Sequence, residues 1–171
     1  MKKFAELQYV RPDMEKIFAR VSGEIAVVKD AQCYEDFRNA YMDYVEADTE
    51  LETSKTIAHV RNTINLLDEF YEAEMVYFNS QMPKYEILKK EMGEVIVASP
   101  FKAEMEKEFG TILIQNMEAQ KQLSDESIVD DQVKEAELVS RFMKTQAAAT
   151  VEFKGEQIGN YGLLKIMQST D

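Results

Sequence analysis

The stretch from Thr49 to Ser80 contains neither glycine nor proline, and its apolar side chains recur at steps of three and four residues. This spacing places them on one side of a helix. The sequence therefore predicts its longest helix here, either continuous or jointed at the sequence NLLDEF, where Asp68 can cap a new turn. The side chains that carry the pattern are Ile57, Val60, Ile64, Leu67, Tyr71, Met75 and Phe78.

Helical spacing also governs the chain on either side of this stretch. One helix is expected to open in the sequence VRPDMEK, with Pro12 in its first turn, and a second to begin near Cys33. Pro83 is expected to break or kink the chain before a further helix that runs to Ser99. The second helix has an aromatic face, which is typical of a buried core rather than a ligand site. That face consists of Tyr34, Phe37, Tyr41 and Tyr44.

Two later helices are expected after capping signals. The sequence SPF, which begins at Ser99, combines a capping hydroxyl with a proline, and one helix is expected from there through Gly110. The sequence SDES, which begins at Ser124, is expected to cap a helix from Ile128 to Ala148.

The apolar period then changes from helical to alternating. Ala149, Val151 and Phe153 alternate with polar residues, and Lys154 and Gly155 suit a two-residue turn. A small β-hairpin is predicted there, followed by one short helix over the sequence NYGLLKIMQ. The predicted fold class is all-α, a multi-helix bundle with one small β-hairpin near the C-terminus.

Two parts of the chain are expected. Residues 1–148 form a helical bundle lobe, and residues 149–171 form a hairpin and short helix that lead into the remainder of a longer protein. The final residues, STD, are a helix-start signal with no helix after them, which indicates such a continuation.

The charge of the chain restricts its partners. With 32 acidic and 20 basic side chains, the formal charge is −12, which argues against nucleic-acid binding. No apolar run is long enough for a membrane span or a signal peptide. The single cysteine, Cys33, excludes an intramolecular disulfide and is typical of a reducing compartment. We expect a cytoplasmic protein with no nucleic-acid or membrane partner.

Few residues could carry chemistry. His59 is the only histidine, so neither an HExxH zinc site nor a di-iron site is available. Cys33 precedes acidic residues that would raise its pKa, and no glycine-rich phosphate loop occurs. The acidic clusters at Asp68–Glu74 and at Asp130 and Asp131 are expected to be solvated helix faces. No catalytic, cofactor-binding or metal-ligating residue is assigned.

Four blocks of sequence resemble, in the same order, the amino-terminal region of the oligoendopeptidase F family of zinc metallopeptidases, relatives of thimet oligopeptidase. They are YVRPDMEK at Tyr9–Lys16, RNTINLLDEFYEAE at Arg61–Glu74, SPFKAEMEKEFG at Ser99–Gly110 and VEFKGEQ at Val151–Gln157. The sequence MQSTD also resembles the family's following junction. The chain departs from the family at Lys102, where arginine is usual, and over residues 158–162.

The resemblance implies a piece of a longer zinc metalloendopeptidase. The family's HExxH helix and distant glutamate ligand lie downstream and have no counterpart here, so the resemblance implies zinc in the parent enzyme, no cofactor in this fragment, and no peptidase activity of the fragment alone. Its implied role is that of a non-catalytic lobe that walls a channel to the zinc and admits short peptides. The implied partners are the catalytic remainder of its own chain and those peptides.

An alternative function is that of a free-standing helical protein-interaction module. A coding region that continues past Asp171 into an HExxH motif would distinguish the first interpretation from the second.

Crowded apolar residues near the C-terminus also predict self-association. Leu163, Leu164, Ile166 and Met167 cannot all face one side of a helix, so a weak, symmetric homodimer through the hairpin and last helix is expected. The competing expectation is a frayed tail beyond Gly162.

Overall fold

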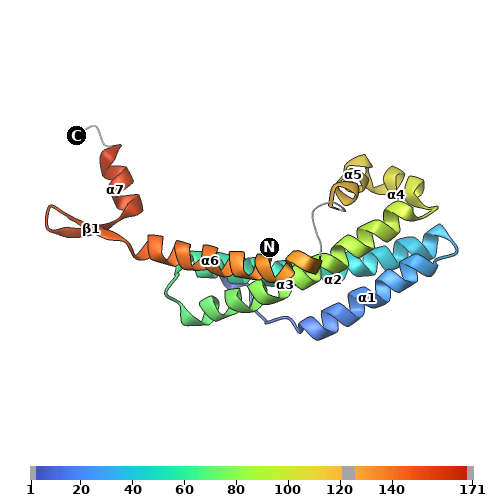
Figure 1. Cartoon of the computed structure of the whole chain (residues 1–171), viewed down its shortest axis with the longest axis horizontal. Coiled ribbons are helices and arrows are strands. Elements are labelled where there is room, and N and C mark those ends of the chain that lie inside the picture. Colours follow the sequence, from blue (N-terminus) through green and yellow to red (C-terminus); the bar gives the residue numbers. More distant parts are fainter. Residues whose placement is uncertain (1–2, 121–125, 169–171) are drawn as a thin grey trace.

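Figure 1 shows the computed structural model of the chain, which describes residues 3–120 and 126–168. The predicted fold class is confirmed: the described residues are mainly helical, with one hairpin near the C-terminus. None of their helices has the length and apolar character needed to cross a membrane. The elements are η1 (Phe4–Glu6), α1 (Met14–Asp30), α2 (Tyr34–Ile64), α3 (Glu69–Ala98), α4 (Lys102–Phe109), α5 (Thr111–Gln120), η2 (Glu126–Ile128), α6 (Val129–Ala148), β1 (Thr150–Phe153), β2 (Glu156–Gly159) and α7 (Asn160–Met167).

The hydrophobic core lies between α1, α2 and α3, which run side by side as three long helices (Figure 1). Phe78 and Tyr85 of α3 are fully buried in it. Phe37, Tyr41 and Tyr44 are also buried, which confirms that the aromatic face of α2 belongs to the core. The short helices α4 and α5 pack against α3.

The division between α2 and α3 differs from the predicted helices. Tyr34 to Ile64 is one continuous helix, so the separate helices predicted on either side of Thr49 are wrong. The jointed alternative is right, because the Asp68 carboxylate accepts the backbone N–H groups of Phe70 (3.0 Å) and Tyr71 (3.3 Å) at the start of α3. This cap satisfies N–H groups that have no partner within the helix.

Pro83 lies inside α3, so of the two alternatives predicted at this residue, a break or a kink, the break is wrong. A proline within a helix removes one backbone hydrogen bond and costs about 3 kcal/mol. Phe78, Met82 and Tyr85 are buried around it, and each such side chain contributes roughly 1.5–3 kcal/mol on burial. The packing of α3 therefore outweighs the local penalty.

Gly110 separates α4 from α5, so the single helix predicted through it is wrong. Its φ angle of 96° lies in the left-handed region, which glycine adopts without steric cost and which ends α4. The predicted restart at Ser99 is confirmed, because its hydroxyl accepts the Phe101 backbone N–H at 3.1 Å.

The first long helix begins later than the predicted opening. The Asp13 side chain accepts the Lys16 backbone N–H at 3.2 Å and caps α1, which starts at Met14. Pro12 therefore precedes the cap and is not in the first turn. Its carbonyl accepts a hydrogen bond from the Tyr77 hydroxyl at 2.8 Å, so its position is fixed by α3.

We call α6, the hairpin and α7, residues 129–167, the arm. None of its residues is buried. The arm is attached to α3 through α6, where Lys144 pairs with Glu72 at 2.5 Å and the Asn79 amide donates to the Ser140 hydroxyl at 3.2 Å. The hairpin and α7 extend beyond the three long helices (Figure 1).

The predicted hairpin is confirmed in both position and turn. Val151 is paired with Ile158 and Phe153 with Glu156, and the two turn residues, Lys154 and Gly155, have φ angles of 54° and 86°. Two positive φ angles are the requirement of a tight turn that matches the twist of its strands. The capping signal at residues 124–125 and the final residues STD lie outside the described residues.

Candidate functional site

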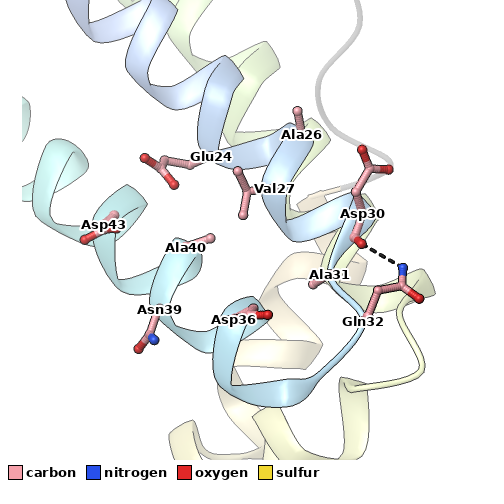
Figure 2. A pocket seen from close by; sticks show the side chains of 10 residues that line it. All are labelled: Glu24, Ala26, Val27, Asp30, Ala31, Gln32, Asp36, Asn39, Ala40 and Asp43. Carbon is pink, nitrogen blue, oxygen red and sulfur yellow. Dashed lines mark hydrogen bonds between the residues drawn. The ribbon is translucent and has the colours of Figure 1, made fainter.

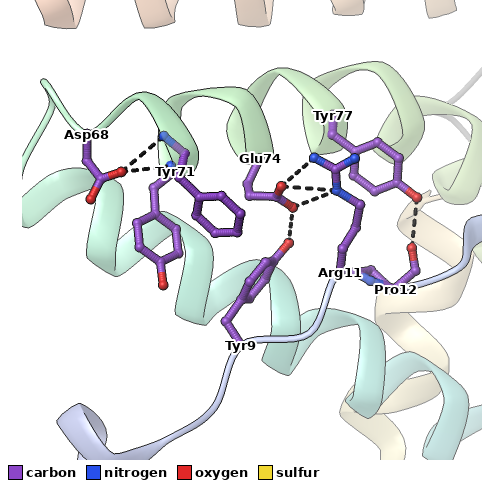
Figure 3. A network of polar contacts seen from close by, with 8 residues as sticks. Tyr9, Arg11, Pro12, Asp68, Tyr71, Glu74 and Tyr77 are labelled. Carbon is purple, nitrogen blue, oxygen red and sulfur yellow. Dashed lines mark hydrogen bonds and ion pairs between the residues drawn. The ribbon is translucent and has the colours of Figure 1, made fainter.

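The N-terminal segment is held against α3 by a polar cluster around a buried carboxylate (Figure 3). Glu74 is 1% exposed, and its oxygens accept hydrogen bonds from the Tyr9 hydroxyl and from Arg11. The Arg11 Nε lies 3.0 and 2.9 Å from the two carboxylate oxygens, so one guanidinium binds both. We call Tyr9, Arg11, Glu74 and Tyr77 the Glu74 cluster.

Aromatic rings pack against this ion pair. The Arg11 guanidinium lies 4.7 Å from the centre of the Tyr77 ring, a favourable cation–π position. The Tyr9 ring meets Phe70 and Tyr71 edge-on, with centroids 6.0 and 5.9 Å apart. The rings exclude water from the carboxylate, which strengthens its hydrogen bonds.

Arg61 at the end of α2 extends the attachment of the N-terminal segment. Its guanidinium donates to the Tyr71 hydroxyl at 2.5 Å and to the Leu7 backbone carbonyl. Residues 7–12 are therefore bound to α2 and α3 by side chains from both helices.

The protonation states of Glu74 and Tyr9 are fixed near neutral pH. Hydrogen bonding from Arg11, and then from Tyr9, holds the pKa of Glu74 below its usual range, although burial opposes this shift. Burial, and then the hydrogen bond to Glu74, raises the pKa of Tyr9. Neither Glu74 nor Tyr9 therefore exchanges a proton near pH 7, so this pair suits anchoring rather than acid–base chemistry.

Glu74 corrects the prediction that the acidic residues after Asp68 form a solvated face. The carboxylate is buried because the N-terminal segment covers it, and no local pattern indicates this covering. The sequence does contain one signal of this contact. Most of the residues that meet here belong to two of the blocks that carry the family resemblance, Tyr9–Lys16 and Arg61–Glu74.

A groove of about 730 Å³ lies on another side of α3, between the end of α2 and α6. Met75 and Val76 of α3, with Val139 and Met143 of α6, supply apolar lining. His59 also lines this groove and is exposed.

A second depression, of about 650 Å³, lies where α1 meets α2 (Figure 2). Its lining includes the carboxylates of Glu24, Asp30, Asp36 and Asp43 and no basic side chain. Burial, followed by the nearby Asp43 carboxylate, raises the pKa of Glu24. This depression has a strongly negative surface.

The other sequence candidates lie apart from one another. Cys33 is exposed and occupies the position before α2, as a small residue at a helix start. Within residues 3–120 and 126–168, no three His, Cys, Asp or Glu side chains are grouped so that they could hold a metal ion. The structure brings none of the candidates for chemistry into one site.

Known proteins resemble this chain in sequence and in fold. A family model described as the Peptidase M3 N-terminal domain matches residues 4–124. No curated protein matches the chain. Among solved structures, PZ peptidase A with an inhibitor is 29% identical with a TM-score of 0.94, covering 99% of this chain and 30% of that chain.

Two further structures are named as oligoendopeptidase F. One is 30% identical with a TM-score of 0.94 and covers all of this chain and 30% of its own. The other, from Bacillus anthracis, is 22% identical with a TM-score of 0.92, covers 98% of this chain and 31% of its own, and supports the fold alone. The chain thus spans about 30% of the length of the structures it matches. Because the family model matches most of its residues, the chain belongs to the peptidase M3 family and corresponds to its N-terminal domain.

Proposed function

We propose that this chain is the non-catalytic N-terminal lobe of a zinc-dependent oligopeptidase. In this function it forms one wall of a channel that admits short peptides to a zinc site in the remainder of the protein. The observation that carries the proposal is that the whole chain superposes on 30% of structures named as PZ peptidase A and oligoendopeptidase F.

The types of residue in this chain support a role in enclosing the peptide rather than in catalysis. Peptidases of the M3 family are generally zinc-dependent, and zinc hydrolases need two imidazoles on one helix. His59 is the only histidine of this chain, so the zinc ligands must come from other residues. In the Glu74 cluster, neither Glu74 nor Tyr9 exchanges a proton at neutral pH, which supports a role as a rigid scaffold.

The proposed partners follow from this role. They are the catalytic remainder of the same chain, which would complete the channel, and the short peptides that enter it. We place the protein in the cytoplasm, because one exposed free cysteine suits a reducing compartment.

The alternative, a free-standing helical interaction module, is favoured by the exposed apolar side chains of the arm. The two functions are separated by the coding region after Asp171. A reading frame that continues into an HExxH helix, in a protein that cleaves short peptides and spares folded proteins, is the expected result. A stop codon directly after Asp171 would overturn the peptidase assignment and leave the interaction module.

A further inference from the structure

The family match and the hydrophobic core both end before the arm begins. The model of the N-terminal domain matches residues 4–124, and the buried core residues lie between Met14 and Ile114. The arm, residues 129–167, adds no buried side chain to this core. By both measures the arm lies outside the N-terminal domain.

The parts of the arm contact one another. The Asn160 amide at the start of α7 donates to the Gln146 carbonyl at the end of α6 at 3.2 Å. The helix α7 packs against β2, where Ile158 lies against Gly162. A two-stranded hairpin and an eight-residue helix are marginal in water by themselves. The arm therefore requires a larger surface to pack on.

The apolar side of α6 faces away from the bundle. Ser140 and Lys144 make the polar contacts with α3. At about 100° per residue, an apolar stripe of α6 is centred about 150° away from these two residues. The stripe consists of Leu138, Val139, Phe142 and Met143, each at least 47% exposed. A helix that packs on a bundle turns its apolar side toward it, so this stripe is arranged for a different neighbour.

The joint between α6 and the bundle is incompletely packed. Val139 and Met143, on the edge of the stripe nearer α3, line the groove of about 730 Å³ described above. Val76 of α3 also lines this groove and is 57% exposed. The bundle therefore does not cover even the near edge of the stripe.

The structures that this chain resembles contain much more chain than the N-terminal domain. The whole chain, arm included, superposes on PZ peptidase A and on one oligoendopeptidase F with a TM-score of 0.94, and covers 30% of each. The arm thus has the same place beside the bundle in longer proteins. Further chain is accordingly the cover that the arm requires.

We propose that the arm belongs structurally to the catalytic remainder. The residues after Asp171 pack on the apolar stripe of α6, on the hairpin and on α7, and the boundary between the two parts of the protein lies between α5 and α6. This boundary differs from the one expected after Ala148. The proposal rests on the proposed function, in which a catalytic remainder follows Asp171.

The exposed apolar area of the arm is sufficient for such packing. At roughly 80 Å² for each half-exposed large side chain, it supplies on the order of 700 Å², within the ~600–1,500 Å² of interfaces between domains. The side chains that supply it are Leu138, Val139, Phe142, Met143, Val151, Phe153, Tyr161, Leu164 and Met167.

Hydrogen exchange in the protein encoded by the complete reading frame, compared with the 171-residue chain, tests where the arm belongs. In the 171-residue chain, we expect the amides of α1, α2 and α3 to be protected and those of the arm to exchange at least about a hundredfold faster. In the complete protein, the arm amides should slow by at least about a hundredfold, because the remainder covers them.

Substitution in the stripe tests the surface itself. Phe142→Asp should speed exchange of the arm at least about tenfold in the complete protein and leave it unchanged in the 171-residue chain, where Phe142 is 64% exposed. Phe142→Leu should retain most of the protection, because leucine keeps the site apolar. Ile112→Asp is the matched control, because Ile112 is 73% exposed on α5, and it should leave exchange of the arm unchanged in both proteins.

Three results would overturn the proposal. Arm amides as protected as those of α1–α3 in the dilute 171-residue chain would place the arm in the N-terminal domain. Protection of the arm that rises with the concentration of the 171-residue chain would mean that a second copy covers it. Arm amides that exchange rapidly in the complete protein would mean that the remainder does not cover it.

The reading frame separates this proposal from the peptidase assignment. A frame that continues past Asp171 without an HExxH helix would overturn the peptidase assignment alone, and protection of the arm would still support the packing. Rapid exchange of the arm in a protein that contains the HExxH helix would overturn the packing alone. A stop codon directly after Asp171 would overturn both.

Discussion

At the scale of single residues, Glu74 has the most demanding position in the chain, because a charged side chain is almost never buried without partners. Its partners are supplied by residues 63 and 65 positions away, Arg11 and Tyr9. A half-exposed arginine compensates the carboxylate while keeping part of its own hydration. The cluster therefore stabilises one position of the N-terminal segment.

Replacing Glu74 with glutamine should lower the free energy of unfolding by about 2 kcal/mol, because the buried pair with Arg11 is lost while the shape is kept. Urea denaturation measures this. Glu69→Gln is the control, since Glu69 is exposed in the first turn of α3 and its loss should cost about 0.5 kcal/mol or less. Equal losses in the two variants would show that Glu74 is not anchored by the cluster.

The same carboxylate predicts how stability depends on pH. Because Arg11 lowers the pKa of Glu74 in the folded state, the unfolded chain binds the proton more tightly. The contribution is therefore complete above the unfolded pKa of about 4.3 and is lost as the pH falls through the lower folded value. The difference in unfolding free energy between wild type and Glu74→Gln should shrink between pH 5 and pH 2. A difference that stays constant over this range would contradict the ion pair.

At the scale of elements, α3 connects the parts of the molecule. Its first half carries Glu74 and Tyr77 of the cluster, while Glu72 and Asn79 hold α6. Its second half contacts α4 and α5. Because α3 is continuous through Pro83, these two halves form one helix.

Replacing Pro83 with alanine should therefore stabilise the protein. Alanine restores a backbone N–H donor and removes the clash with the preceding turn, a gain of about 1–2 kcal/mol after the greater freedom of the unfolded chain is counted. Thermal unfolding should shift upward by several degrees. Pro100→Ala is the control, because Pro100 lies in the turn before α4 and should give no gain. A destabilised Pro83→Ala variant would mean that the packing of α3 requires the proline ring.

At the scale of the whole molecule, the bundle and the arm differ in how they are stabilised. The core residues lie between Met14 and Ile114, and the arm adds no buried side chain. The bundle is stabilised by its own apolar contacts, whereas the arm depends on whatever covers it.

The 171-residue chain should bind no zinc with submicromolar affinity and should cleave no peptide. One histidine cannot supply the imidazole pair of the family's zinc site, and no alternative ligand group exists within residues 3–120 and 126–168. Calorimetric titration with zinc and a quenched-peptide assay measure the two properties. A one-to-one zinc site of submicromolar affinity would contradict the prediction.

Much of the architecture followed from the sequence. The helical class, the cap at Asp68, the restart at Ser99 and the hairpin turn at Lys154 and Gly155 were predicted correctly, because each depends on neighbours within four residues. Apolar period, side-chain caps and positive φ angles are all local properties, and they act before the chain is compact.

Only the tertiary structure decided whether a helix continues through Pro83 and through Gly110, and whether Glu74 is buried. The local cost of Pro83 in a helix was predicted correctly, but the packing of α3 that outweighs this cost is not visible in the local sequence. Gly110 was predicted to lie within a helix, whereas the chain turns at this residue. Glu74 is acidic in an acidic stretch, and it is buried because Tyr9 and Arg11, far away in sequence, lie over it. Local free energies select the elements, whereas burial depends on which distant segment covers a residue, and that is settled when the chain packs.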